Sequence, residues 1–594
     1  MKKIMMTVVL AMTASIMMAG EIFVSPAGND GAAGTASAPL KTIQRALRLA
    51  REWRRTGNAN LYGGIRIVLE GGSEFQLDEP LYIRPEDSGS PECKTVICSG
   101  GSSQAIISGG VTLLKNFMGV TTYDAPCIGG RPLLIRSLWA GDKKLRMAAS
   151  FGDGVMEPMV DFSKDVETIT IPAATLAKFG ITDIKDAPQL EMLVHQRWAI
   201  AILRVRDIRI QGDRAILSFL NPESRWEFSH PWPQPVIDGE RGTSAYFLRN
   251  AQTMLDENDE WYQDYRTGQI QLGSAANDNL VAPRLNRLVT IEGNSGEQVH
   301  DIVFENVAFE YAAWERPGQK GHVTLQGGFP IIDAYKLTEN EGLPWAKTLE
   351  NQAWVERPEA AVSLTFAKRV DFKGCTFKHL AATALDYVDG CSEVSIKDNT
   401  FEDIGGTAIM AGSFAEGSTE VHRPYGISTQ EVSYQHPETS AFTIEGNSIT
   451  DATNEDWGAV AIGCGFVRDF TISNNRVSHV NYSGICIGWG WTARDTGMRN
   501  NKILNNMVTD YARQLYDAGG IYTMSLQSGS LIKGNTVSTP HQAPYATNYR
   551  AFPIYFDACS DGFTVYDNNL ETTKTMKEKY GWNTPGPAMH IDEK

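Results

Sequence analysis

The chain has 594 residues, 42% hydrophobic and 21% charged, a balance that is ordinary for a folded protein with a large core. Its formal net charge of −16 argues against nucleic acid or another polyanion as a partner, because phosphate binding needs clustered lysines and arginines. Eight cysteines in so long a chain do not make a disulfide scaffold, although Cys93 and Cys98 could pair around a short loop. No cofactor and no metal site is predicted.

Residues 1–20 have the pattern of a secretory signal peptide. Two lysines precede an apolar run from Ile4 to Met18, and the small residues Ala19 and Gly20 follow. The run is too short and wrongly flanked for a membrane span, and no later stretch of about 18 uncharged apolar residues occurs. We therefore expect export to the periplasm or the extracellular space, without stable insertion in a membrane.

Residues 21–130 are predicted to form an N-terminal cap and the first coils of a solenoid. A strand at Ile22–Ser25 precedes a helix that opens at Pro39. One face of this helix is apolar and consists of Leu40, Ile43, Leu47 and Ala50. A short helix of this kind covers the open end of stacked coils, as solenoids require. The first coil strands are predicted at residues 65–69, 81–83, 95–97 and 105–108.

Residues 131–284 follow a different pattern, in which longer alternating strands are joined by tight turns. Examples are the strands at 190–198, 208–217 and 261–272 and the turns at 211–213 and 266–268. We interpret this region as an antiparallel β-sandwich inserted into the coils. It also contains three tryptophans, predicted to be buried or at a rim rather than to reach substrate: Trp198, Trp226 and Trp232.

Residues 285–594 repeat one phrase, a strand-sized apolar word that ends in asparagine. The phrase endings include Asn306, Cys375, Asn399, Asn447, Asn475, Asn506, Asn535 and Asn568, with intervals of 24, 28, 31, 29 and 33 residues among them. Such a repeat predicts stacked parallel β-coils, and so an all-β fold. A column of asparagines has a structural explanation, because asparagine tolerates the left-handed conformation at a bend and stacked side chains can bond one another.

Three segments interrupt the repeat, at residues 317–358, 413–440 and 540–550. Coils do not need such loops, so these are candidates for the walls of a binding cleft.

Alignment of the strands places Val460, Ile485, Ile521 and Ile554 in one inward column. Because side chains alternate along a strand, Tyr522, Tyr555 and Asp557 then share the outer face. A second column, four residues earlier at the corner before the strand, consists of Asp456, Asn481 and Asp517.

Asp517 and Asp557 are the candidate catalytic pair. Two carboxyl groups in one groove suit glycoside cleavage, where one protonates the leaving oxygen and the other attacks the anomeric carbon or activates water. Their proximity requires the chain to bend between Asp517 and Ile521, which Gly519 and Gly520 permit. Each acid alone could equally be a turn or capping carboxylate.

Several neighbours are candidates for contact with sugar. Trp457, Trp489 and Trp491 offer flat apolar faces that could stack on sugar rings or simply pack. His541 could donate a proton or bind sugar, or be an ordinary surface histidine. The full predicted substrate-binding set is Asp456, Trp457, Trp489, Trp491, Tyr522, His541 and Tyr555.

These residues resemble a known family. The segments 481–491, 517–523 with 527–530, and 554–557 look like the C-terminal signature of glycoside hydrolase family 141. The opening Phe23–Asp30 and the hairpin residues Glu260–Tyr262 are also similar to that group. The resemblance implies a right-handed parallel β-helix with an inserted β-sandwich, and it implies that Asp517 and Asp557 are the catalytic pair. This chain departs from the family pattern at Ala518 and at Ala558–Cys559, which bears on substrate identity.

The resemblance further implies an α-L-fucosidase acting on plant pectic or host glycans, or less often a xylanase or another exo-glycosidase. A polysaccharide lyase on the same fold is a second hypothesis; the acidic net charge and the lack of a Lys/Arg cluster near the acids in the sequence weigh against it. A third is a glycan-binding solenoid without catalysis. The sequence leaves open the linkage cleaved, the stereochemical course and which aspartate is the general acid.

Overall fold

The computed structural model describes residues 19–592 except for 58–62, 116–120, 152–155, 231–232, 238–242, 275–278, 333–336, 340–346, 350–354, 415–437, 492, 494, 547–549 and 574–576. The predicted signal peptide, apart from its last two residues, and Trp232 lie outside this part of the chain. Within it, no helix combines the length and the apolar character needed to cross a membrane.

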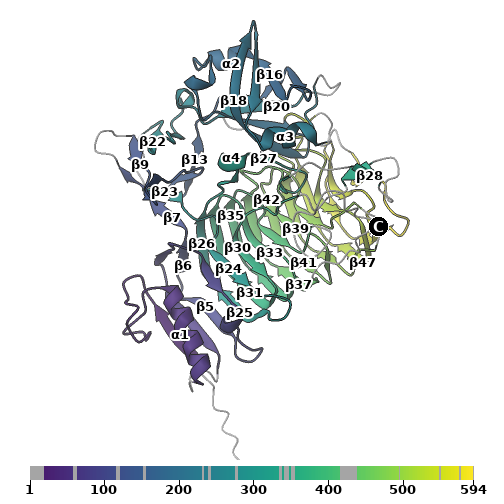
Figure 1. Cartoon of the computed structure of the whole chain (residues 1–594). Coiled ribbons are helices and arrows are strands. Elements are labelled where there is room, and N and C mark those ends of the chain that lie inside the picture. The colour runs from purple at the N-terminus through teal and green to yellow at the C-terminus, as the bar shows by residue number, and fades with distance from the viewer. Residues whose placement is uncertain are drawn as a thin grey trace, which may run out of the picture.

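Three parallel sheets form the faces of a right-handed β-helix, which confirms the expected fold class (Figure 1). The chain visits them in the order sheet 1, sheet 2, sheet 3 and then returns to sheet 1 one coil further on. Alternate residues of the strands point inward, and their apolar side chains form a continuous core from Ile22 to Val565.

The strands of each sheet are as follows. Sheet 1 contains β1 (Gly20–Val24), β2 (Ile65–Glu70), β5 (Thr95–Gly100), β25 (Val299–Glu305), β31 (Ala367–Lys373), β34 (Ser392–Lys397), β37 (Thr439–Glu445), β41 (Thr471–Ser473), β44 (Lys502–Leu504), β47 (Leu526–Lys533), β50 (Asp561–Tyr566) and β53 (His590–Asp592), with β40 (Val467–Arg468) beside β37. Sheet 2 contains β3 (Glu74–Gln76), β6 (Ala105–Ser108), β26 (Val307–Ala312), β32 (Thr376–Leu380), β35 (Thr400–Ile404), β38 (Ser448–Ala452), β42 (Arg476–Ser478), β45 (Met507–Tyr511), β48 (Thr536–Pro540) and β51 (Asn569–Leu570). Sheet 3 contains β4 (Leu81–Ile83), β24 (Val289–Glu292), β30 (Ala360–Thr365), β33 (Thr383–Tyr387), β36 (Ile409–Ala411), β39 (Ile462–Cys464), β43 (Ile485–Ile487), β46 (Ala518–Thr523), β49 (Ala551–Phe556) and β52 (Tyr580–Trp582).

The predicted capping helix is α1 (Ile43–Thr56), which packs against β1 and β2. It begins later than Pro39, because the Thr42 side chain accepts a hydrogen bond from the Arg45 amide and fixes the N-terminus there. Gly57 ends it at a φ of 63°, a conformation that favours glycine. Its buried face consists of Ile43, Ala46, Leu47 and Ala50.

The insertion leaves the β-helix after β6 and returns before β24. Its strands form two sheets that are largely antiparallel, running from Gly110 to Pro283, so they start before the expected residue 131. Sheet 4 has an apolar cluster of its own, whereas the core of sheet 5 is continuous with that of the β-helix. Sheet 4 contains β7 (Gly110–Thr112), β23 (Leu280–Pro283), β12 (Leu138–Ala140), β13 (Lys143–Met147), β21 (Glu260–Gln263), β22 (Gln269–Leu272), β9 (Thr122–Asp124) and β8 (Leu114–Lys115). Sheet 5 contains β14 (Glu157–Pro158), β20 (Ala245–Arg249), β17 (Glu191–Gln196), β18 (Ala199–Gln211), β19 (Arg214–Phe219), β16 (Thr168–Pro172) and β15 (Asp161–Ser163), and β27 (His322–Val323) joins it beside β18.

The remaining elements are short. They are the helices α2 (Ala173–Ala177), α3 (Glu223–Ser229) and α4 (Arg316–Lys320), the 3-10 helices η2 (Pro85–Asp87), η3 (Ile184–Asp186) and η4 (Gln252–Met254), and the two-stranded pairs β10 (Cys127–Ile128) with β11 (Arg131–Pro132) and β28 (Leu337–Glu339) with β29 (Lys347–Leu349).

The asparagine column lies at the corner between sheets 1 and 2. Each side-chain amide donates to the carbonyl oxygen of the next asparagine, at 2.9–3.0 Å, from Asn399 to Asn568. The expected stacking is therefore confirmed. The expected left-handed conformation is found not at these asparagines but at the residue before each of them. The residues with positive φ are Asp398, Gly446, Asn474, Asn505, Gly534 and Asp567.

Two further expectations need correction. Ile485 pairs in register with Ile462 rather than Val460, because the corner before β39 is two residues longer than assumed. Ile485 pairs with Ile521, and Ile521 pairs with Ile554, as expected. No disulfide joins any of the eight cysteines, all of which lie in the described part of the chain, so Cys93 and Cys98 are not bonded to each other. Cys464, Cys486 and Cys559 are buried, as predicted.

Candidate active site

Asp517 and Asp557 lie at opposite ends of two neighbouring strands of sheet 3. Asp517 directly precedes β46, and Asp557 directly follows β49, one coil further on. Tyr522 and Tyr555 are paired in register between them, and their rings contact edge to face at 5.1 Å. The Tyr555 hydroxyl donates to Asp517 Oδ1 at 3.0 Å, and the Tyr522 hydroxyl donates to Asp557 Oδ2. One tyrosine pair therefore connects the two acids.

The chain bends at the two glycines that the sequence singled out. A Cβ atom on Gly519 would lie 2.6 Å from the Ile521 carbonyl oxygen, an approach that an extended strand does not make. A Cβ atom on Gly520 would lie 2.3 Å from Val537 Cγ1 in the core. Neither position has room for a side chain. The bend permits Asp517 to face the same cluster as Asp557 despite their offset in register.

Asp517 is a strained and partly covered acid. Its φ is 60°, in the left-handed region, and its side chain is 21% exposed. Burial raises the pKa of its carboxyl above the ordinary value. The positive charge of Arg550, whose Nη1 lies 3.4 Å from Asp517 Oδ1, opposes this pKa shift, and the negative charge of Asp557 adds to it.

Asp557 is 7% exposed and accepts hydrogen bonds from three side chains. Besides Tyr522, the Trp491 indole donates to Oδ2 at 2.9 Å and the Asn583 amide donates to Oδ1 at 2.7 Å. Hydrogen bonds to both oxygens stabilise negative charge on a carboxylate and fix its orientation. The two acids thus have different surroundings.

Gln326 links the supports of both acids. Its amide nitrogen lies 3.0 Å from the Tyr522 hydroxyl and 3.4 Å from the Tyr482 hydroxyl. The Tyr482 hydroxyl donates to the main-chain oxygen of Asp517 at 3.0 Å. One amide therefore holds the two tyrosines that position Asp517 and Asp557.

The insertion also reaches this cluster, through the turn between β17 and β18. The main-chain oxygen of Arg197 in this turn accepts a hydrogen bond from the Tyr516 amide at 3.3 Å. The positive charge of the Arg197 side chain, like that of Arg550, opposes the upward shift that burial gives the pKa of Asp517. The Trp198 indole donates to the Leu325 carbonyl at 3.0 Å. Trp198 is half-buried and Trp226 is buried, in line with their interpretation as packing residues.

Sequence reasoning missed Gln326, Arg550 and Asn583. Gln326 and Arg550 lie in segments that were predicted to form cleft walls, and this interruption of the repeat is the sequence feature that could have identified them. Asn583 follows the last strand of sheet 3, and nothing in the repeat singled it out.

Trp489 and Trp491 differ in position. The Trp491 ring is half-buried beside Asp557, whereas Trp489 is 2% exposed and lies behind it at 4.8 Å between ring centroids. Trp489 also contacts Phe329 and Phe414 at 5.2 Å each. It supports Trp491 from the interior.

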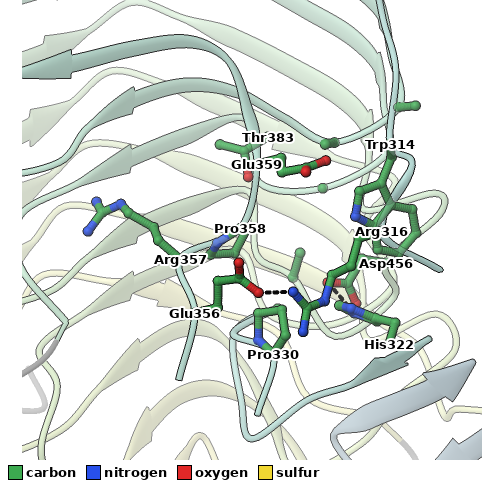
Figure 2. Close-up of a pocket in the computed structure, with 15 residues that line it drawn as sticks. Trp314, Arg316, His322, Pro330, Glu356, Arg357, Pro358, Glu359, Thr383 and Asp456 are labelled. Carbon is green, nitrogen blue, oxygen red and sulfur yellow. Dashed lines mark hydrogen bonds and ion pairs between the residues drawn. The ribbon is translucent and has the colours of Figure 1, made fainter. Parts of the chain in front are cut away.

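Three residues of the predicted substrate-binding set lie apart from the two acids. His541 forms a hydrogen bond with Asp510, which lies in β45 of sheet 2. Trp457 contacts Phe247 of the insertion, with their ring centroids 6.1 Å apart. Asp456 lies in a small buried pocket, where its Oδ2 is 3.1 Å from His322 Nε2 (Figure 2).

That pocket has a volume of about 30 Å³, enough for an ordered water molecule. Figure 2 shows Arg316 paired with Glu356 near the Asp456–His322 pair, with Glu359 and Thr383 across the pocket. Because β27 and the following turn carry both His322 and Gln326, this ionic cluster holds the turn that supports the active-site tyrosines.

Among the residues that the structure describes, no group of three or more histidine, cysteine, aspartate or glutamate side chains is arranged to hold a metal ion. The acid cluster itself brings together two carboxyls, two arginines, three tyrosine hydroxyls and an indole, a set suited to acid and base chemistry on a polar substrate.

Comparisons with known proteins agree with this chemistry. The model of the GH141 insertion domain matches residues 119–272. A solved structure described as a glycoside hydrolase is 35% identical, with a TM-score of 0.88 and coverage of 96% of both chains. A complex of XylC with xylose (12% identity, TM-score 0.40, 95% of this chain and 72% of the other) and a GH136 lacto-N-biosidase from Eubacterium ramulus (10%, 0.34, 96% and 68%) are more distant. No curated protein matches the chain.

Proposed function

The chain belongs to glycoside hydrolase family 141, and from this premise we propose that it is an α-L-fucosidase that uses Asp517 and Asp557 on plant pectic or host glycans. The observation that carries the catalytic part is the bonding of both acids to one tyrosine pair. The fucoside specificity rests on the resemblance of residues 481–557 to the family signature.

Asp517 is the general acid in this proposal. Its raised pKa keeps its carboxyl protonated to higher pH than that of an exposed aspartate, as a donor to the leaving oxygen requires. Asp557 is the second acid of the pair, and hydrogen bonds from Tyr522, Trp491 and Asn583 orient it. It either attacks the anomeric carbon or activates water.

The lyase hypothesis loses one of its counter-arguments. The sequence suggested no cluster of cations near the acids, but Arg550 and Arg197 both act on the pKa of Asp517. Family membership now weighs against a lyase, and turnover of pectin with an unsaturated product would revive it.

The test is a screen of p-nitrophenyl glycosides, with the α-L-fucoside first, followed by xylan and pectin fragments. Release of nitrophenol from the fucoside, lost in both Asp517→Asn and Asp557→Asn, supports the proposal. Cleavage of xylan or of another aryl glycoside alone would replace the fucosidase assignment by xylanase or another exo-glycosidase. Near-normal turnover by both variants would reject the catalytic pair.

We also propose that the protein is exported. The support is the N-terminal pattern of residues 1–20. N-terminal sequencing of protein recovered from the periplasm or medium should begin after the apolar run.

A further inference from the structure

A second cleft lies between the insertion and sheet 2. Its volume is about 820 Å³, within the range of ligand-binding sites. One wall is formed by β13 and β20 of the insertion, including Lys144 and Phe247. The other wall is formed by the ends of sheet 2 strands and the corner that follows them, including Trp457.

A column of left-handed residues lines the wall of this cleft. His379, Asp403, Asp451 and His479 have φ values of 56°, 53°, 53° and 61° at equivalent places in successive coils. The repeat of this backbone conformation turns one polar side chain per coil toward the insertion. This wall of the cleft therefore repeats once per coil, as the asparagine column does at another corner.

The cleft is separate from the acid cluster. Neither Asp517 nor Asp557 lines it. Arg513 does line it. The end of β17 and the turn after it contact the next residues of that corner: His195 Nε2 is 2.8 Å from the Gln514 carbonyl oxygen, and the Arg197 carbonyl oxygen accepts from the Tyr516 amide at 3.3 Å. The turn therefore lies at the corner between Arg513 and Asp517.

The charges in the cleft are balanced. Five arginines and lysines and five aspartates and glutamates line it. Lys144 lies 2.7 Å from Glu455 and 3.7 Å from Asp403, and Asp403 also accepts from His379 at 2.7 Å. A polyanion would need an excess of cations, which this lining does not offer. Fixed ion pairs instead present donors and acceptors suited to hydroxyl groups.

The cleft also has an aromatic side. Trp457, Phe247 and Phe151 line it and are all half-buried, so part of each ring is open to the cleft. Aromatic faces beside polar groups match the alternating apolar and hydroxyl-bearing surfaces of a sugar ring.

We propose that this cleft binds a segment of neutral polysaccharide, separately from the catalytic site. Binding there holds a polymer close to the acids and raises its effective concentration at the active site, an advantage that a small substrate cannot use. The proposal does not depend on the roles of Asp517 and Asp557.

Native affinity electrophoresis in gels containing xyloglucan, xylan or polygalacturonate tests the proposal. The wild type should be retarded by at least one of the two neutral polymers. Trp457→Ala should weaken that affinity by about tenfold or more, as expected for an aromatic anchor, and Trp457→Phe should retain most of it. Tyr82→Ala removes another exposed aromatic, 50% exposed in β4, and should have no effect.

Thr450→Arg, which fills the cleft from sheet 2 with a long side chain, guards against a folding defect in Trp457→Ala and should also reduce retardation. Trp457→Ala and Thr450→Arg should each cleave p-nitrophenyl α-L-fucoside at a rate within twofold of the wild type. Lack of retardation by both neutral polymers, retardation by polygalacturonate alone, or unchanged affinity in both variants would overturn the proposal. Failure of the wild type to cleave the fucoside would count against the proposed function, while the binding result would stand.

Discussion

Two corners of the same coil show how one architecture serves stability and chemistry. At the corner between sheets 1 and 2, an asparagine recurs in successive coils, and those from Asn399 to Asn535 are at most 1% exposed. Around sheet 3, the acid cluster repeats one residue type in register, at Tyr522 and Tyr555, and its other members come from different coils and from the turn after β27. Uniform stacking pairs every buried amide, whereas a site requires groups that the repeat does not supply. Substitutions at the two places should therefore have different consequences.

The largest expected effect is on catalysis at the acid corner. Asp517→Asn and Asp557→Asn should each lower kcat by about 10³-fold or more, because each removes a proton donor or a charged partner. Circular dichroism should show an intact fold. Asp371→Asn, at a buried carboxyl of sheet 1, is the matched control and should leave kcat unchanged.

The next effect is on stability at the asparagine corner. Asn475→Ala should lower the free energy of unfolding by about 3 kcal/mol, because it leaves the buried Asn447 amide and the Ile444 carbonyl without their partners. Urea unfolding measures this change. Asn474→Gly, at the exposed neighbour with a φ of 57°, should change stability by less than about 0.5 kcal/mol. Equal losses in both variants would contradict the structural role of the column.

A smaller effect is expected at Gln326, which comes from a loop and bonds two tyrosines of the coils. Gln326→Leu should lower kcat about tenfold with little change in KM, because Tyr522 and Tyr482 lose a shared partner while the acids remain. Gln319→Leu, at an exposed glutamine of α4, controls for loss of an amide. A change confined to KM would indicate that Gln326 contacts substrate rather than positions the tyrosines.

The smallest effect concerns the pH profile. The general acid must be protonated, so activity falls as pH rises through the pKa of Asp517. Arg550 lowers that pKa, and Arg550→Met should therefore move the alkaline limb of kcat/KM to higher pH. Arg266→Met, at an exposed arginine of the insertion, should leave the limb in place. A shift to lower pH would contradict the assignment of Asp517 as the acid.

The parts of the fold that repeat could be predicted from the sequence, because each coil restates the same local rule. The asparagine column, the pairing of Ile521 with Ile554 and the need for Gly519 and Gly520 all follow from short phrases. The sequence placed Val460 opposite Ile485, where the structure has Ile462. The error arose because the number of residues in a corner varies from coil to coil, so the position of one strand does not determine the register of the next.

The supports of the acids could not be predicted in the same way. Gln326 and Asn583 meet Tyr522 and Asp557 across long stretches of chain, and their types are ordinary in loops. The loops were recognisable as interruptions, but which side chain they direct toward the acids depends on packing that local patterns do not encode.

The insertion makes contacts with consequences for how the protein is made. Met156, near its start, bonds the hydroxyl of Tyr545, and the Arg197 turn bonds Tyr516. During translation, residues 110–283 leave the ribosome well before the coils that they touch exist. The surface of the nascent insertion therefore stays uncovered until the last coils are made. A prematurely terminated chain would have the insertion half of these contacts but would lack the coil half and the acids.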